Sequence, residues 1–251
     1  MKKKLLIYIG IVVGIIILII VTNVVMRYQR INIVNYIINY PTEDHIISEQ
    51  GVQDSLLAHF GQFTKERRKD ISTEKMKQYL ESLNFISRVD IAITMTGKLN
   101  ITVFESEPIV RVYPKVGKSF YIDNDFNVLQ VVEYKPSHTM IATGNLPTER
   151  DMQKDSLRNV LKDVYDLATL IRKDSILKYQ IDQIDLKDTS FILIPKIGDY
   201  TILLGNKDSW QDALTRLHYL YKSSFIYRDW LQYSKIDLRF NQQVICTRKE
   251  K

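Results

Sequence analysis

The residues best suited to acid–base or metal chemistry are dispersed along this sequence. The four histidines are His45, His59, His138 and His218, and none has another His, Cys or carboxylate at metal-ligand spacing. His59 and His218 fall on predicted helices near apolar neighbours, so we expect them at the boundary of a core. A Ser/His/Asp site would converge only in space and stays open, but no nucleophile-elbow pattern or Gly-rich phosphate loop is present.

Two groups of carboxylates also have the spacing for chemistry. Glu105 and Glu107 end a predicted strand; a catalytic pair would need a cleft and two different environments, whereas a solvated strand end needs neither, so we predict the latter. Asp123 to Asp125 begin like a calcium loop, but Val128 and Tyr134 occupy the positions that need Gly and Glu, which predicts a β-turn. The sequence therefore predicts no enzyme, no metal, no cofactor and no small-molecule substrate.

The basic charge is concentrated at one end of the chain. The formal net charge is +6, with 35 basic and 29 acidic residues among 251. Residues 1–30 contain five Lys or Arg and no acid, which leaves a net charge of +1 for the rest. The excess is therefore typical of membrane orientation, and we expect no nucleic-acid surface.

The elements that would position any site begin with an apolar stretch, Leu5 to Met26. It contains no charged residue, and about twenty residues at about 1.5 Å each cross the ~30 Å hydrocarbon core as a helix. A cleaved signal peptide is the alternative, but the run is long for one and ends in Thr22 to Met26 without a small-residue cleavage site. We predict an uncleaved transmembrane helix at 5–26.

The flanking charges predict the orientation of this helix. Lys2 to Lys4 and the amino terminus precede it, and Arg27 and Arg30 follow. The positive-inside tendency places the tail 1–4 in the cytoplasm and the bulk of a single-pass chain outside the membrane. A lone cysteine, Cys246, cannot form an intramolecular disulfide, which agrees with an oxidising compartment.

Hydrophobic periodicity then predicts a compact α+β module. Its elements in order are a strand at Ile31–Tyr40, helices at Ser48–Phe60 and from Ser72 to about Leu83, and a hairpin of Val89–Met95 with Leu99–Val103. Two helices would cover one face of the sheet. The basic segment Gly61–Asp70 between the helices is predicted to be a solvated loop.

Pro108 marks the start of a second region, a mixed β domain with two flanking helices. Its predicted strands are Ile109–Tyr113, Ser119–Ile122, Val128–Val132, Thr139–Thr143, Ile181–Leu186, Phe191–Ile197, Tyr200–Leu204, Lys235–Phe240 and Val244–Arg248. One helix is expected from Thr148 or Asp151 to Arg172 and another from about Asp208. The final strand is a candidate for binding an extended partner chain by strand addition. The alternative is that the charged tail at 249–251 only protects an exposed sheet edge from aggregation, and both interpretations stay open at this point.

The order of these elements and several short motifs resemble the bacterial division family FtsQ/DivIB over nearly the whole chain. The run from Phe85 to Ile91 and the hairpin end Ile101-x-Val103-x-Glu105-x-x-Pro108 resemble its first-to-second domain signature. Phe120 to Asp123 resembles a family turn, and Asp237-Leu238-Arg239-Phe240 its closing motif, with Phe240 in place of the more usual Tyr.

The resemblance implies a non-catalytic, membrane-anchored scaffold at the division septum. It implies a periplasmic POTRA-like domain at 31–106, a β domain at 107–248 and a charged tail at 249–251. The implied partners are FtsB and FtsL in the inner membrane and, through them, FtsW and FtsI. FtsB would add a strand to the last strand, and the implied partner-binding residues are Arg239, Phe240, Val244, Ile245, Cys246, Thr247 and Arg248.

Two other functions remain as alternatives. The first is a POTRA-containing periplasmic chaperone or secretion-assembly component, which would need tandem POTRA units or a C-terminal barrel, and neither is visible in the sequence. The second is an anchored periplasmic hydrolase, which would show a deep pocket lined by converging polar groups.

Overall fold

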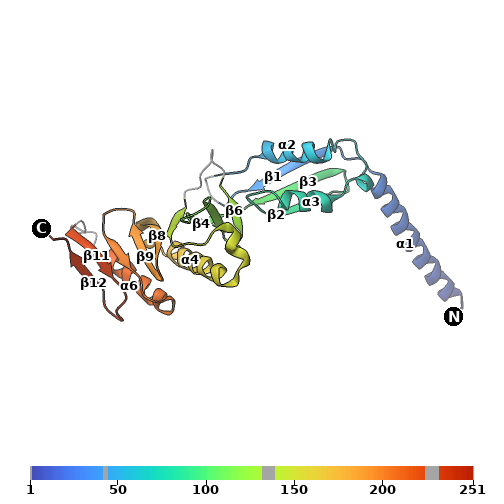
Figure 1. The fold of residues 1–251 in the computed structure, drawn as a ribbon. Helices are drawn as coiled ribbons and strands as arrows, with labels where there is room; N and C mark the ends of the chain where they lie inside the picture. Colours follow the sequence, from blue (N-terminus) through green and yellow to red (C-terminus); the bar gives the residue numbers. More distant parts are fainter. Residues whose placement is uncertain (1, 42–44, 132–138, 224–231, 251) are drawn as a thin grey trace. The chain divides into compact units, whose positions relative to one another are not determined.

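The computed structural model describes residues 2–41, 45–131, 139–223 and 232–250, and for residues 2–7 only the backbone. The chain divides into two compact units, Met1–Ser106 and Glu107–Lys251. The predicted α+β class is confirmed: an N-terminal apolar helix is followed by mixed helices and strands that include a large mixed sheet (Figure 1).

The first helix, α1, runs from Lys2 to Tyr28. Its segment Tyr8–Tyr28 has 21 residues and is long and apolar enough to cross a membrane. At about 1.5 Å per residue this segment spans roughly 30 Å, the thickness of a hydrocarbon core.

The rest of the first unit is a three-stranded sheet with two helices. Its elements are β1 (Ile33–Asn39), α2 (Glu49–Phe60), the short 3₁₀ helix η1 (Arg68–Asp70), α3 (Thr73–Glu81), β2 (Ile86–Ile93) and β3 (Lys98–Glu105). The strand order is β1-β3-β2, with β1 parallel and β2 antiparallel to β3. Ser48 and Ser72 cap α2 and α3 by accepting from the backbone N–H groups of Gly51 and Lys75.

Alternation along the central strand builds the core of this unit. Leu99, Ile101 and Val103 of β3 are at most 1% exposed, while the residues between them are partly exposed. They share one cluster with Val52 and Leu56 of α2 and with Met76 and Leu80 of α3. The period-two and helical patterns of the sequence therefore meet in one buried layer.

The second unit is built on a nine-stranded mixed sheet. Its strands are β4 (Pro108–Val112), β5 (Phe120–Asp123), β6 (Val128–Gln130), β7 (Met140–Gly144), β8 (Ile181–Lys187), β9 (Ser190–Pro195), β10 (Thr201–Leu203), β11 (Tyr233–Asp237) and β12 (Ile245–Arg248). The order is β12-β11-β10-β9-β8-β7-β4-β5-β6. The pairs β4/β7, β7/β8 and β10/β11 are parallel and the others antiparallel.

Two long helices, α4 (Asp155–Lys173) and α6 (Trp210–Ser223), share the hydrophobic core of this sheet. The described part of the unit also contains the short helices η2 (Glu149–Gln153), α5 (Leu177–Gln180) and η3 (Lys207–Ser209). The predicted single helix from Thr148 or Asp151 is wrong at its start, because Lys154 has an extended backbone and separates η2 from α4.

The closing motif also differs from the prediction. The strand expected at Lys235–Phe240 is β11, Tyr233–Asp237, so Arg239 and Phe240 lie beyond its end. The backbone N–H of Arg239 donates to Asp237 Oδ1 at 3.1 Å, which turns the chain away from the ladder. Aspartate side chains commonly accept hydrogen bonds from nearby backbone N–H groups in this way and so compete with the sheet ladder.

Candidate partner-binding edge

Strand β12 lies at one end of the nine-stranded sheet. It pairs antiparallel with β11, with Ile245 opposite Asp237 and Thr247 opposite Lys235. No strand follows β12 in the sheet order of the described residues. Its second edge can therefore form main-chain hydrogen bonds with another chain.

The direction of the backbone groups along β12 follows from one contact just beyond it. Lys249 donates its backbone N–H to the carbonyl of Gln232 at 2.8 Å, on the β11 side. Because these groups alternate along an antiparallel strand, Thr247 and Ile245 also face β11. The N–H and C=O groups of Cys246 and Arg248 consequently point to the open edge.

The side chains of the predicted strand divide between two faces. Val244, which lies just before β12, and Cys246 are partly buried and pack against the core of the second unit. Burial raises the pKa of the Cys246 thiol, which disfavours a reactive thiolate. Ile245 and Thr247, which alternate with them, are exposed on the other face, with Ile245 at 41%, and Arg248 at the end of the strand is also exposed. The strand thus combines a fixed inner face with an accessible outer face.

Arg239 is already engaged by its own chain. Its Nε and one terminal nitrogen donate to the two carboxylate oxygens of Asp237 at 2.9 and 2.6 Å. Hydrogen bonds from Arg239 hold the pKa of the Asp237 carboxyl below its usual value, and the same pairing raises the pKa of Arg239. The Arg239 side chain is still 53% exposed. A guanidinium has five N–H donors, so donors remain on its exposed side.

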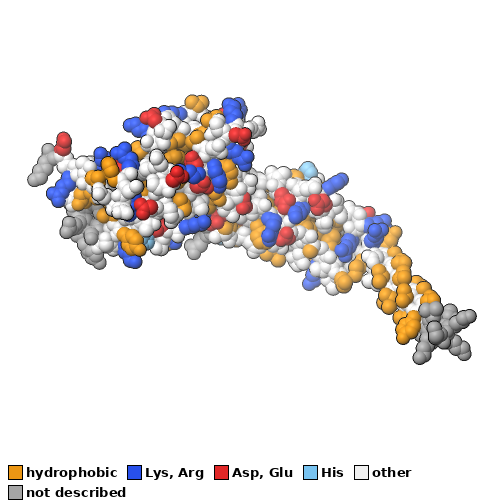
Figure 2. Space-filling view, turned by 90° about the horizontal axis from the view of Figure 1, so that it is seen from below, with side chains coloured by type: hydrophobic (Ala, Val, Ile, Leu, Met, Phe, Trp, Pro, Cys, Tyr) orange, Lys and Arg blue, Asp and Glu red, His pale blue; other side chains and the backbone are white. Residues whose placement is uncertain are grey.

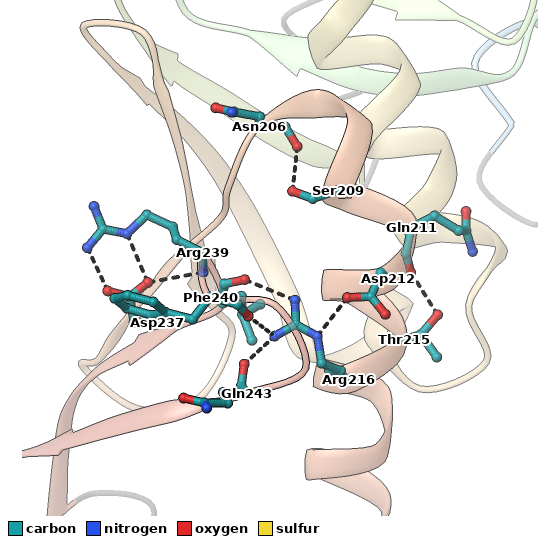
Figure 3. Close-up of polar contacts among 11 residues, drawn as sticks. Asn206, Ser209, Gln211, Asp212, Thr215, Arg216, Asp237, Arg239, Phe240 and Gln243 are labelled. Carbon is teal, nitrogen blue, oxygen red and sulfur yellow. Dashed lines mark hydrogen bonds and ion pairs between the residues drawn. The ribbon is translucent and has the colours of Figure 1, made fainter.

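Sequence reasoning missed Arg216, which positions the turn before β12. This residue of α6 donates from its guanidinium to three backbone carbonyls, those of Leu238 at 3.0 Å, Phe240 at 2.9 Å and Gln243 (Figure 3). Its Nε also donates to Asp212, one helical turn earlier, at 2.9 Å. The side chain is only 14% exposed. Arg216 therefore ties the connection between β11 and β12 to a core helix.

The only sequence signal for Arg216 was its i,i+4 spacing from Asp212, which is typical of an ordinary surface pair on a helix. Its main partners are backbone carbonyls 22 to 27 residues away, and no pattern of side chains in the sequence predicts these contacts. Phe240, predicted as a contact residue, is 49% exposed and takes part in this arrangement through its carbonyl.

Two of the four histidines, His218 and His59, have pairing and packing roles. His218 contacts the Asp174 carboxylate at 2.8 and 2.9 Å. Burial opposes ionisation of Asp174, but hydrogen bonds from Leu177, His218 and Ile176 hold its pKa below the usual value. His59 stacks on a tyrosine of α3, and His138 lies outside the described residues. Within the described ranges, no three His, Cys, Asp or Glu residues are grouped so as to hold a metal ion.

The carboxylates at the predicted strand end are not both solvated, which corrects that prediction. Glu105 is 6% exposed, and its Oε1 accepts the backbone N–H of Ile46 at 2.7 Å. Glu107 forms an ion pair with Arg172 of α4. The β-turn at Asp123 is confirmed, because the Phe126 N–H donates to the Asp123 carbonyl at 3.1 Å, and Asp123 Oδ1 also accepts the N–H groups of Asp125 and Asn127.

Comparison with protein families identifies the second unit. The family described as FtsQ/DivIB, C-terminal related, matches residues 107–247, which include Arg239 and most of β12. The chain belongs to the FtsQ/DivIB-related family. The FtsQ/DivIB family is a non-catalytic scaffold of cell division, so membership supports a division scaffold role with divisome proteins as partners. The apolar helix α1 fits single-pass membrane anchoring. A search of curated proteins found no match to the chain.

Proposed function

We propose that this FtsQ/DivIB-related protein is a non-catalytic scaffold of the bacterial divisome at the septum. Helix α1 anchors it in the inner membrane as a single-pass type II protein, and both folded units lie in the periplasm. Residues 31–106 act as a POTRA-like domain, which the strand-helix-helix-strand-strand order supports. Residues 107–248 act as the partner-binding β domain.

The partner in this proposal is the FtsB chain, which adds a strand to β12. The observation that carries it is the open edge of β12, where the main-chain groups of Cys246 and Arg248 point away from β11. Main-chain pairing supplies affinity, and exposed side chains such as Ile245 supply specificity. FtsB brings FtsL, and the two link this scaffold to FtsW and FtsI.

In this arrangement Arg239 contributes through the donors that Asp237 leaves unused. The bidentate contact with Asp237 holds the guanidinium in one orientation before any partner arrives. A preorganised guanidinium loses less side-chain entropy when it binds a partner carboxylate. We therefore assign Asp237 a positioning role and Arg239 a contact with an acidic residue of the partner.

Substitution of Arg248 tests strand addition. Arg248→Pro removes the outward N–H and leaves the inward bonds of Thr247 and Lys249 in place. We expect the full chain in nanodiscs to bind the periplasmic segment of FtsB at least about tenfold more weakly, because one main-chain hydrogen bond is lost and the proline ring occupies its path.

Arg248→Ala is the matched control, since it removes the same side chain but keeps the N–H. It should bind within about threefold of the parent, which corresponds to less than 1 kcal/mol. If Arg248→Pro binds as well as Arg248→Ala, strand addition at this edge is wrong. Proline at Ile245 would be a poorer test, because that N–H faces β11 and its loss would break the hairpin itself.

A further inference from the structure

We infer that the chain carries a basic collar for anionic phospholipid headgroups where α1 leaves the membrane. The collar consists of six basic residues, Arg27, Arg30, Lys65, Arg67, Arg68 and Lys69. The inference rests on membrane anchoring by α1 and is independent of the edge strand β12. It concerns the leaflet in which the C-terminal end of α1 lies.

Four backbone hydrogen bonds hold the collar beside the end of α1. Arg68 N–H donates to Gln29 O at 2.9 Å, Lys65 N–H to Ile31 O at 2.8 Å, and Ile31 N–H to Glu66 O at 2.9 Å. The fourth joins Asn32 N–H to Gly97 O at 2.9 Å. Ile31 between them is fully buried. The segment after α1 is thus folded into the first unit, and the basic loop is held beside the end of α1.

The turn at Gly97 packs equally closely against this segment. A Cβ on Gly97 would lie 2.5 Å from the carbonyl oxygen of Arg30, and Gly97 has a φ of +80°, which a side chain disfavours. Met95 of the same turn is 73% exposed and, with Val25 and Tyr28 of α1, lines a hollow. An exposed apolar side chain next to the end of a membrane span is suited to the interfacial layer.

The charges of the collar are available to a ligand. Five of its six basic residues are exposed and Arg68 is partly exposed. None of the six forms an ion pair with another residue that the structure describes. Figure 2 shows the apolar side chains of α1 giving way to Lys and Arg side chains where the helix ends.

Tyr28 adds an interfacial anchor within the collar. The Lys69 ammonium lies 4.7 Å and the Arg67 guanidinium 5.8 Å from the centre of its ring. Tyrosine is enriched at the headgroup level of membranes, and the two cations therefore lie at the depth of lipid phosphates. Only Glu66 and Asp70 oppose them within the loop. The local excess of positive charge fits an anionic headgroup such as phosphatidylglycerol.

A fluorescence-quenching experiment tests this inference on the full chain. Bimane is attached to Met95→Cys in a Cys246→Ser background, and the protein is reconstituted in phosphatidylcholine nanodiscs. The discs contain a small fraction of chain-spin-labelled lipid with either a phosphatidylglycerol or a phosphatidylcholine headgroup. Because one basic side chain near an anionic surface is worth about fivefold in binding, we expect phosphatidylglycerol to quench at least about threefold more strongly.

The Lys65→Gln/Arg67→Gln/Lys69→Gln variant should bring this quenching ratio close to one. The matched control is Lys115→Gln/Lys118→Gln/Lys187→Gln, which removes three exposed lysines of the second unit and should keep the ratio. In the parent protein, salt should also lower the ratio as the Debye length falls from about 10 Å at 0.1 M to about 4 Å at 0.5 M.

Three results would overturn the inference. The first is a parent ratio near one at low salt, and the second is an unchanged ratio in the collar variant. The third is an equal loss in both triple variants, which would indicate a general charge effect. If the collar variant fails to fold, the salt titration of the parent protein still tests the inference.

Discussion

Replacing Arg216 by methionine removes the guanidinium that holds the turn before β12 and keeps most of the apolar stem. Of the three carbonyls it serves, that of Leu238 belongs to a fully buried residue, while Phe240 and Gln243 are exposed and their carbonyls can bond to water. The ion pair with Asp212 contributes little, because that carboxylate is 63% exposed. The cost therefore comes mainly from the Leu238 carbonyl.

An unsatisfied buried acceptor costs about 1–3 kcal/mol, and each lost bond to a charged donor costs up to about 3 kcal/mol before water replaces it. We expect Arg216→Met to lower the free energy of unfolding of the β11–β12 hairpin by about 3 kcal/mol, or about 100-fold in the opening equilibrium. Hydrogen exchange of the β11-facing amides of Thr247 and Lys249 should accelerate by the same factor. Exchange in Arg216→Lys should be faster than in the parent and slower than in Arg216→Met, since an ammonium cannot span all three carbonyls.

Lys222→Met is the control, because Lys222 is an exposed basic residue of the same helix. It should leave the exchange of both amides within about twofold of the parent, in keeping with a neutral surface change. Unchanged exchange in Arg216→Met would refute the positioning role. Equal acceleration across β8 and β9 would refute it as well, because the effect would then be global and not specific to the hairpin.

Two further predictions concern the stability of the second unit. Gly144→Ala should lower its free energy of unfolding by more than about 3 kcal/mol in urea titration, because Gly144 has a φ of +101° and an added Cβ would lie 2.1 Å from the Leu186 carbonyl oxygen. Gly117→Ala is the control: Gly117 has a φ of +99° but no close backbone atom, so this change should cost only about 1 kcal/mol. Equal costs for the two variants would contradict the steric argument. For Asp237, whose pKa Arg239 lowers, the stabilising contribution is complete above the unfolded pKa of about 4 and is lost as pH falls through the lower folded pKa. The stability difference between the parent and Asp237→Asn should therefore shrink between about pH 5 and pH 2, and a difference independent of pH would argue against this pairing.

Much of the fold could be predicted from local patterns. The apolar run of α1, the serine caps at Ser48 and Ser72, and the hairpin of β2 and β3 all depend on neighbours close in sequence. Such features can be predicted because hydrophobic periodicity and helix capping depend on residues only a few positions apart. The predicted start of α4 was wrong because Lys154 has an extended backbone that separates η2 from α4, and the apolar stripe begins only after it.

The contacts of the basic loop and the burial of Glu105 could not be predicted from neighbouring residues in the sequence. The loop is largely exposed, as expected, but backbone bonds that the sequence did not predict tie Lys65, Glu66 and Arg68 to the segment after α1. Glu105 was expected in solvent and is buried. The contacts of the loop and the burial of Glu105 both depend on which distant backbone groups lie nearby. Every residue type except proline carries the same N–H and C=O groups, so the side-chain sequence does not reveal these contacts.

The sequence by itself determined the long apolar helix α1, the β-strand character of the last segment and the short motifs shared with the FtsQ/DivIB family. Only the tertiary structure decided that β12 lies at the edge of its sheet, since that position follows from the parallel pairing of β10 with β11 across the whole of α6. It also decided that Arg216 holds the turn before this strand and that Asp237 engages Arg239. Strand order and contacts to backbone carbonyls are non-local, so no periodicity in the chain encodes them.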